Sequence, residues 1–78
     1  NEFASANYGA WPNPTVGVVN IVSPSATEAI VVDVAGRVIM RERLTIGTNV
    51  LDLTALSPGG YLITSANGAF TPMRVVRD

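Results

Sequence analysis

The chain has 78 residues, of which 47% are hydrophobic and 14% charged, and its formal net charge is −1. This length allows one domain, and the charge balance argues against a nucleic-acid partner, because displacing counterions from phosphates requires clustered positive charge. The absence of cysteine excludes disulfides and zinc–thiolate sites. No apolar run approaches the ~20 residues of a membrane-spanning helix, so direct membrane insertion is not expected.

The hydrophobic residues follow the pattern of strands rather than helices. Val and Ile dominate them, and turn residues recur about every 8–12 positions. Seven short strands are predicted, at residues 8–11, 16–22, 28–34, 37–44, 50–53, 61–66 and 69–76. The spacing predicts an all-β fold, a compact Ig-like β-sandwich of about seven antiparallel strands. We interpret residues 1–7 as an N-terminal linker or cloning-derived residues, and residues 8–78 as the domain.

Alternation along the middle strands predicts which side chains share a face. In the strand at residues 28–34 one face carries Ile30, Val32 and Val34. In the strand at residues 37–44 the residues expected to point inward are Val38, Met40 and Leu44. Glu42 breaks that alternation, so a bulge is expected there. Further along, the residues expected in the core are Leu51, Leu53 and Leu56, with Asp52 in water.

The last two predicted strands form a hairpin. Asn67-Gly68 suits a type I′ turn, in which both central residues need φ > 0. Pro72 cannot donate to a ladder, so the final strand is expected at a sheet edge or with a bulge. Met73 and Val75 should face the core, and Arg74 and Val76 should face outward.

Catalysis has no evident machinery in this sequence. There is no histidine or cysteine, and the serines lack a base to activate them. Asp33 and Asp52 could act as an acid–base pair, but nothing in their spacing brings them together. We therefore predict a noncatalytic protein with no cofactor and no metal. Five scattered aromatic rings form no row of the kind that binds carbohydrate, and Trp11 is interpreted as a lid on the sandwich.

The arginines allow two interpretations. Three of them share a face with Ile39 on one predicted strand: Arg37, Arg41 and Arg43. That face is either a solvated surface, which we favour, or a docking stripe for an acidic partner. Arg74 and Arg77 lie on the last strand. Charges there block edge-to-edge aggregation, while the same exposed edge could accept a strand from a partner or from a second copy.

Three turn motifs occur in a fixed order and are followed by a basic terminal strand. The first is Trp11-Pro12-Asn13-Pro14 with Gly17, and the second is Asp33 with Gly36 and Arg37. The third is Pro58-Gly59-Gly60-Tyr61, after Leu53 and Leu56. Over residues 8–77 this order resembles the C-terminal sorting domains of type IX (Por) secretion cargo. In that family Tyr is usual in place of Trp11, a β-branched residue is frequent in place of Gly60, and the chain often ends in lysine.

The resemblance implies a noncatalytic C-terminal secretion signal in Gram-negative bacteria. It implies passage of an N-terminally attached cargo from the periplasm through the type IX outer-membrane translocon to the cell surface or the medium. Removal by a surface sortase and cell-surface anchoring often follow. The implied partners are translocon and shuttle proteins and the surface sortase. The alternative from a different class is a generic Ig-like adhesion or ligand-binding module of a surface protein.

The resemblance also divides the residues by role. Recognition by the translocon is expected at the end of the chain, at Met73, Arg74, Val75, Val76, Arg77 and Asp78. The motif residues are expected to be mainly structural, because their turn chemistry is sufficient explanation: Pro12, Asn13, Pro14, Gly17, Asp33, Gly36, Arg37, Pro58, Gly59 and Tyr61.

Overall fold

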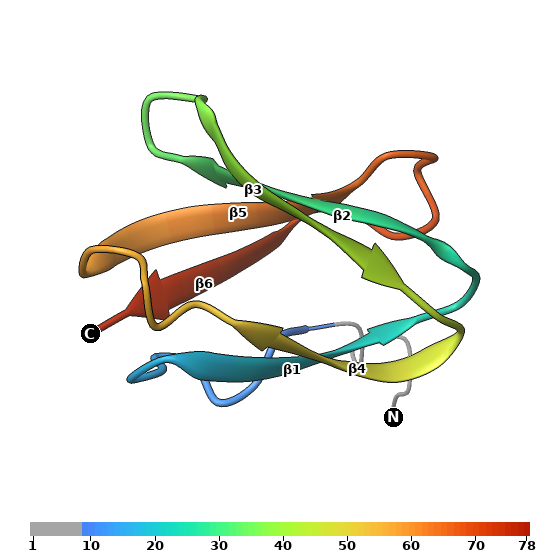
Figure 1. Ribbon diagram of the computed structural model, residues 1–78, viewed down its shortest axis with the longest axis horizontal. Helices are drawn as coiled ribbons and strands as arrows, with labels where there is room; N and C mark the ends of the chain where they lie inside the picture. The colour runs from blue at the N-terminus through green and yellow to red at the C-terminus, as the bar shows by residue number, and fades with distance from the viewer. Residues whose placement is uncertain (1–8) are drawn as a thin grey trace.

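Two antiparallel sheets face each other in the computed structural model, which describes residues 9–78 (Figure 1). One sheet pairs β1 (Val18–Ser23) with β4 (Gly47–Asp52). The other has the order β3-β2-β5-β6, with bounds Val38–Leu44, Thr27–Asp33, Gly59–Ser65 and Met73–Arg77. The predicted all-β sandwich is confirmed, with six strands among the described residues rather than about seven. None of these residues is helical, so this part of the chain has no helix able to cross a membrane.

The predicted first strand is not present as a strand in the described residues. Its first residue, Tyr8, and the predicted domain boundary beside it lie outside residues 9–78. Trp11 makes only an isolated antiparallel bridge to Asn20 of β1. The bridge does not extend into a ladder because Pro12 and Pro14 have no N–H to donate.

The core fills the space between the facing sides of the sheets. Its central side chains are at most 5% exposed: Val19, Ile21, Ala29, Val31, Leu44, Leu51, Leu53, Ile63, Met73 and Val75. Full burial of one such aliphatic side chain contributes about 1.5–3 kcal/mol. The predictions for the segment after β3 are confirmed: Leu51 and Leu53 are buried, Asp52 is exposed, and Leu56 packs against the core.

Ile30 and Val32 share a face of β2, as alternation predicts, and that face is the outer one. The core side of β2 carries Ala29 and Val31, whereas Ile30 and Val32 are only partly buried. Val34 lies beyond the strand and is 90% exposed. Both faces of this strand are apolar, so alternation tells which residues share a face but not which face meets the other sheet.

The bulge in β3 lies at Ile39, not at Glu42. Val31 pairs with Met40 and Val32 with Val38, so Ile39 is the extra residue, while Glu42 pairs regularly with Ala29. The bulge turns Val38 to the outer side, where it is 49% exposed, and lets Ile39 pack against the core. Ile39 therefore does not share the face of Arg41 and Arg43. Glu42 stays in water because β3 is the edge of its sheet.

The hairpin of β5 and β6 is confirmed, but the predicted type I′ turn is wrong. The Gly68 amide donates to the Ser65 carbonyl at 3.2 Å, which places Asn67 and Gly68 third and fourth in the turn rather than at its two centres. The Asn67 side chain accepts from Ser65 Oγ and from the Ala69 amide. β6 begins only after Pro72, and it lies at the sheet edge, as expected.

Candidate functional site: the terminal strand and its edge

The terminal strand presents two different faces. Met73 and Val75 are buried in the core, while Arg74 and Val76 face outward and are exposed, as alternation predicts. Asp78 is also exposed. Of the six residues expected to be recognised, only Arg74, Val76 and Asp78 thus have exposed side chains.

Arg77 has a structural position. Its Nε donates to the Leu53 carbonyl and its Nη2 to the Thr54 carbonyl, both at 3.2 Å, and its Nη1 donates to the Asp78 carbonyl. These bonds fasten the end of β6 to the segment after β4. The guanidinium is thereby occupied within the domain.

The outer edge of β6 is covered rather than open. Asn13 Nδ2 donates to the Arg74 carbonyl, and Asn13 Oδ1 accepts from the Val76 amide, both at 2.9 Å. The Thr15 amide donates to the Val76 carbonyl, and the Asp78 amide donates to the Thr15 carbonyl, both at 2.8 Å. A side-chain amide has the same donor and acceptor groups as a peptide, so Asn13 substitutes for backbone in a segment where two prolines lack N–H.

We call residues 11–15 the edge cover, because they bridge the edges of both sheets. At the other end, the Trp11 amide donates to the Asn20 carbonyl at 3.0 Å and the Asn20 amide donates to the Trp11 carbonyl at 2.7 Å. Thr15, which is 2% exposed, is fixed by Oγ1, which donates to the Val18 carbonyl and accepts from the Gly17 amide. The edge cover therefore joins β1 to β6 along one side of the sandwich.

Gly17 allows the chain to leave the edge cover close to the segment after β4. Its carbonyl accepts from the Leu53 amide at 2.7 Å, and a Cβ at this position would lie 2.4 Å from Thr54 Cγ2. A side chain at position 17 would therefore require Thr54 to move. The contacts described for Asn13 and Gly17 thus all lie within the domain.

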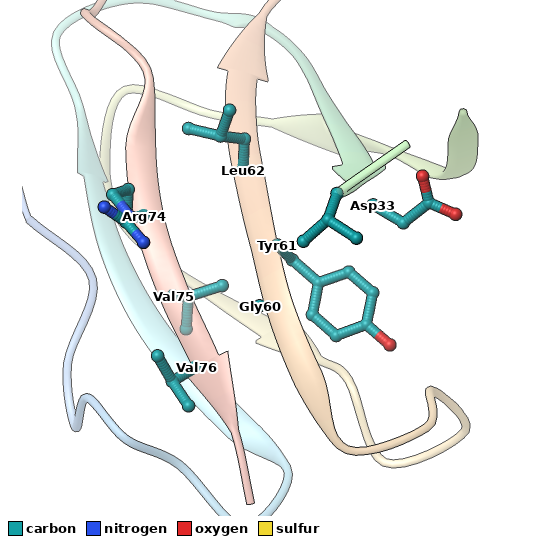
Figure 2. Close-up of a pocket in the computed structure, with 8 residues that line it drawn as sticks. Asp33, Gly60, Tyr61, Leu62, Arg74, Val75 and Val76 are labelled. Atoms are coloured by element: carbon teal, nitrogen blue, oxygen red, sulfur yellow. The ribbon is translucent and has the colours of Figure 1, made fainter. Parts of the chain in front are cut away.

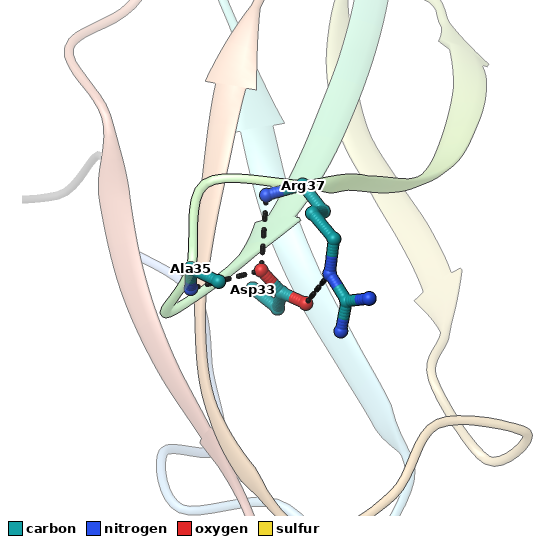
Figure 3. A network of polar contacts seen from close by, with 3 residues as sticks. All are labelled: Asp33, Ala35 and Arg37. Atoms are coloured by element: carbon teal, nitrogen blue, oxygen red, sulfur yellow. Dashed lines mark hydrogen bonds and ion pairs between the residues drawn. The ribbon is translucent and has the colours of Figure 1, made fainter.

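The second motif is a turn held by one carboxylate (Figure 3). Asp33 Oδ1 accepts from the amides of Ala35 and Arg37 at 2.9 and 3.0 Å, and Oδ2 pairs with Arg37 Nε at 3.1 Å. Gly36 has φ +85°, which favours glycine. The hydrogen bond from the Arg37 amide is the main cause that lowers the pKa of Asp33.

Asp52 holds a separate turn at the end of β4. Its Oδ1 accepts from Thr54 Oγ1 at 2.5 Å and from the Thr54 amide at 3.0 Å, and the hydroxyl bond is the main cause that lowers its pKa. Asp33 ends β2 in the other sheet. The two carboxylates are each engaged in their own turn and do not form a pair. Among the described residues no three His, Cys, Asp or Glu side chains are grouped to hold a metal ion.

The third motif anchors β5 and leaves a hollow beside β6 (Figure 2). Tyr61 packs against the core, and its hydroxyl donates to the Ser57 carbonyl at 2.5 Å. Gly60 pairs with Val76 and has no side chain on the outer face. An open depression of about 310 Å³ results, with walls that include Val34, Leu62, Arg74 and Val76.

The remaining arginines lie at the opposite edge of the same sheet. Arg41 pairs in register with Ile30, and its Nη1 forms an ion pair with Glu28 at 3.2 Å. Arg43 pairs in register with Glu28 and is exposed. An exposed ion pair of this kind contributes about 0–1 kcal/mol, which is consistent with a solvated face.

The edge cover is the feature that sequence reasoning missed. Sequence reasoning assigned Pro12, Asn13 and Pro14 to a turn and treated the edge of β6 as exposed. Thr15 and Asn20, which hold the cover, were not singled out. One signal was present: between two prolines that lack N–H, the Asn13 side chain supplies both a donor and an acceptor.

The fold and this site define a small β-sandwich domain whose polar motifs hold turns and a strand edge. The chain belongs to the family described as secretion system C-terminal sorting domain, whose model matches residues 9–76. It is thus a type IX sorting domain, a class of export signals that engages the type IX secretion machinery and directs proteins across the outer membrane to the cell surface or the medium. Comparisons with curated proteins and with solved structures found no match.

Proposed function

We propose that this domain is a noncatalytic signal that takes an N-terminally attached cargo through the type IX outer-membrane translocon, and that the machinery recognises residues 73–78. The cargo passes through the periplasm, where shuttle proteins and the translocon bind the domain. Removal of the domain by a surface sortase and anchoring of the cargo at the cell surface often follow such export. The observation that carries this proposal is the family match over residues 9–76.

The position of residues 73–78 supports their assignment as the recognised segment. They form an edge strand that ends at the surface, with Arg74, Val76 and Asp78 exposed. A partner can reach this strand without entering the core. The described carboxylates that accept several hydrogen bonds, Asp33 and Asp52, are engaged in turns, which agrees with a signal rather than a catalyst.

The test is export of a passenger fused to the N-terminus of the domain in a host with a type IX system. We expect the fusion with the full domain in the medium or at the surface, and the fusion that lacks residues 73–78 inside the cell. Truncation also removes Met73 and Val75 from the core, so the matched control is Leu51→Ala, which weakens the core and keeps the terminal segment. Export of the truncated fusion would disprove the recognition of residues 73–78. Retention of the full fusion in the periplasm would disprove the sorting role.

The alternative, an Ig-like ligand-binding module, is favoured by one observation, the open depression beside Gly60. Its walls include Val34, Leu62 and Val76, so it would accept an apolar group. A Cβ at position 60 would lie 3.8 Å from Val34 Cγ1, which is ordinary van der Waals contact. Gly60→Val therefore places a side chain in this depression without a clash at Cβ. A sorting signal keeps its export with this variant. A parent fusion that is not exported, together with loss of binding of an apolar probe in Gly60→Val with an unchanged fold, would favour the alternative.

A further inference from the structure

We propose that the edge cover is a displaceable occupant of β6, and that an extended segment of a secretion-machinery protein replaces it by strand addition. This inference rests on the proposed function, since it says how residues 73–78 are recognised. Its starting observation is that residues 13 and 15 already bind the edge of β6 through groups of the kind a strand offers. The isolated bridge between Thr15 and Arg77 is parallel.

The edge cover pairs with β6 incompletely. A strand offers a backbone donor and acceptor to its neighbour at every second residue. Because Pro12 and Pro14 lack N–H, the cover instead offers the side-chain amide of Asn13 and the backbone N–H and C=O of Thr15. The Arg74 amide shares the outward side with the Arg74 carbonyl, and among the described residues it donates no hydrogen bond. An added strand would accept from this amide and would replace the bonds that the cover makes to β6.

The edge cover is also held more weakly than the strand on the other side of β6. Trp11 is 44% exposed and Asn13 is exposed, and Thr15 is the buried residue of the cover. β5, by contrast, contributes Ile63 to the core, at 0% exposure, and pairs with β6 along five residues. Segments with little buried apolar surface open locally before the fold as a whole.

Charge indicates the chemistry of the added strand. Arg74 is exposed, and no described carboxylate lies within ion-pair distance of it, whereas Arg37 and Arg41 each have such a partner. Opposite charges on neighbouring strands stabilise their pairing. The segment that replaces the cover is therefore expected to carry Asp or Glu beside Arg74.

Amide hydrogen exchange of the isolated domain tests whether the cover opens on its own. The amides of Val76 and Asp78 bond to the cover, whereas the amide of Val75 points to β5. We expect protection at Val76 and Asp78 to be at least ten-fold lower than at Val75, and to fall further at Val76 in Asn13→Ala. Equal protection along β6 would show that the cover opens only with the whole fold, and would overturn the proposal.

A disulfide between the cover and β6 tests whether opening is needed for export. The chain has no cysteine, so Thr15→Cys/Arg77→Cys places one pair of thiols at two bridged residues, and the periplasm oxidises such pairs. Each single-cysteine variant is the matched control, because it loses the same native side-chain bonds. We expect the double variant to melt at least as high as the controls and to be exported at least ten-fold less. Export at the level of the controls would overturn the proposal.

Arg74→Glu, compared with Arg43→Glu at the opposite edge, tests the charge. We expect at least a five-fold loss of export for Arg74→Glu alone, and equal export of both variants would overturn the assigned partner chemistry. Failure of strand addition and failure of the proposed function are distinguishable. In the first case the domain with the Thr15→Cys/Arg77→Cys disulfide is exported while the truncated domain is not. The machinery would then recognise the outer face of β6 rather than its edge. In the second case either the truncated domain is exported as well or the full domain is retained in the periplasm.

Discussion

Asn13→Ala is the most direct test of the edge cover as a stabilising element. The substitution removes two hydrogen bonds, from Asn13 Nδ2 to the Arg74 carbonyl and from the Val76 amide to Asn13 Oδ1. One intramolecular hydrogen bond contributes about 0.5–1.5 kcal/mol net. Since both bonds are exposed, water replaces part of each, and we expect a loss of about 1–2 kcal/mol in the free energy of unfolding.

The assay is thermal and urea unfolding followed by two signals. Far-UV circular dichroism reports the sheets, and fluorescence reports the cover, because Trp11 is the one tryptophan of the chain. For a domain of this size the expected loss lowers Tm by roughly 5–15 °C. Asn13→Asp is the matched variant: it keeps the acceptor for the Val76 amide and loses the donor to the Arg74 carbonyl, so its loss should be smaller. If the Tm of Asn13→Ala lies within a degree of the parent's, the hydrogen bonds of Asn13 make no net contribution to stability and the reasoning is refuted.

Three further predictions concern the core, the turns and the depression. Leu51→Ala should cost about 2–5 kcal/mol by urea unfolding, since Leu51 is 0% exposed, and the neighbouring Val50→Ala, at 62% exposure, should cost under about 0.5 kcal/mol. A similar loss in both would contradict the assigned face of β4. Because folding lowers the pKa of Asp33 and Asp52, their ionised carboxylates stabilise the folded domain above the unfolded-state pKa of about 4. This contribution to stability is lost as pH falls through the folded-state pKa values. The slope of stability against pH below pH 4 should therefore flatten in Asp33→Asn/Asp52→Asn, and an unchanged slope would argue against these turns as its source. Gly60→Val should raise stability by up to about 1 kcal/mol, because it replaces glycine in a strand and a Cβ there has room, and a destabilised variant would show that the depression is smaller than described.

The sequence determined the fold class and the outward residues of the last strand. Val and Ile at alternating positions, with turn residues between them, specify strands locally, and the burial of Leu51 and Leu53 around exposed Asp52 follows from the same period of two. Pro72 predicted an edge position for the last strand, and β6 does lie at the edge, although the strand begins after Pro72. The Asp33 turn was expected too, since an Asp before a glycine bonds nearby amides.

The alternation of side chains along a strand leaves several features open, and the tertiary structure decided them. The apolar character of both faces of β2 left open which side meets the other sheet, and packing buried Ala29 and Val31 while it left Val34 in water. The bulge at Ile39, rather than Glu42, follows from the register that β3 takes against β2. The Asn67-Gly68 pair specified a turn, but the bonds of Asn67 with Thr27 and Ser65 set its type.

The position of the edge cover on β6 follows only from the tertiary structure. Asn13 and Arg74 are separated by 61 positions, and no local pattern indicates that a side-chain amide near one end completes the edge of a strand near the other. The sequence determined which groups needed partners: the amide side chain of Asn13 and the outward backbone groups of an edge strand. The three-dimensional arrangement decided that they satisfy one another, because buried or edge-exposed backbone groups bond to whatever donors and acceptors packing brings within reach.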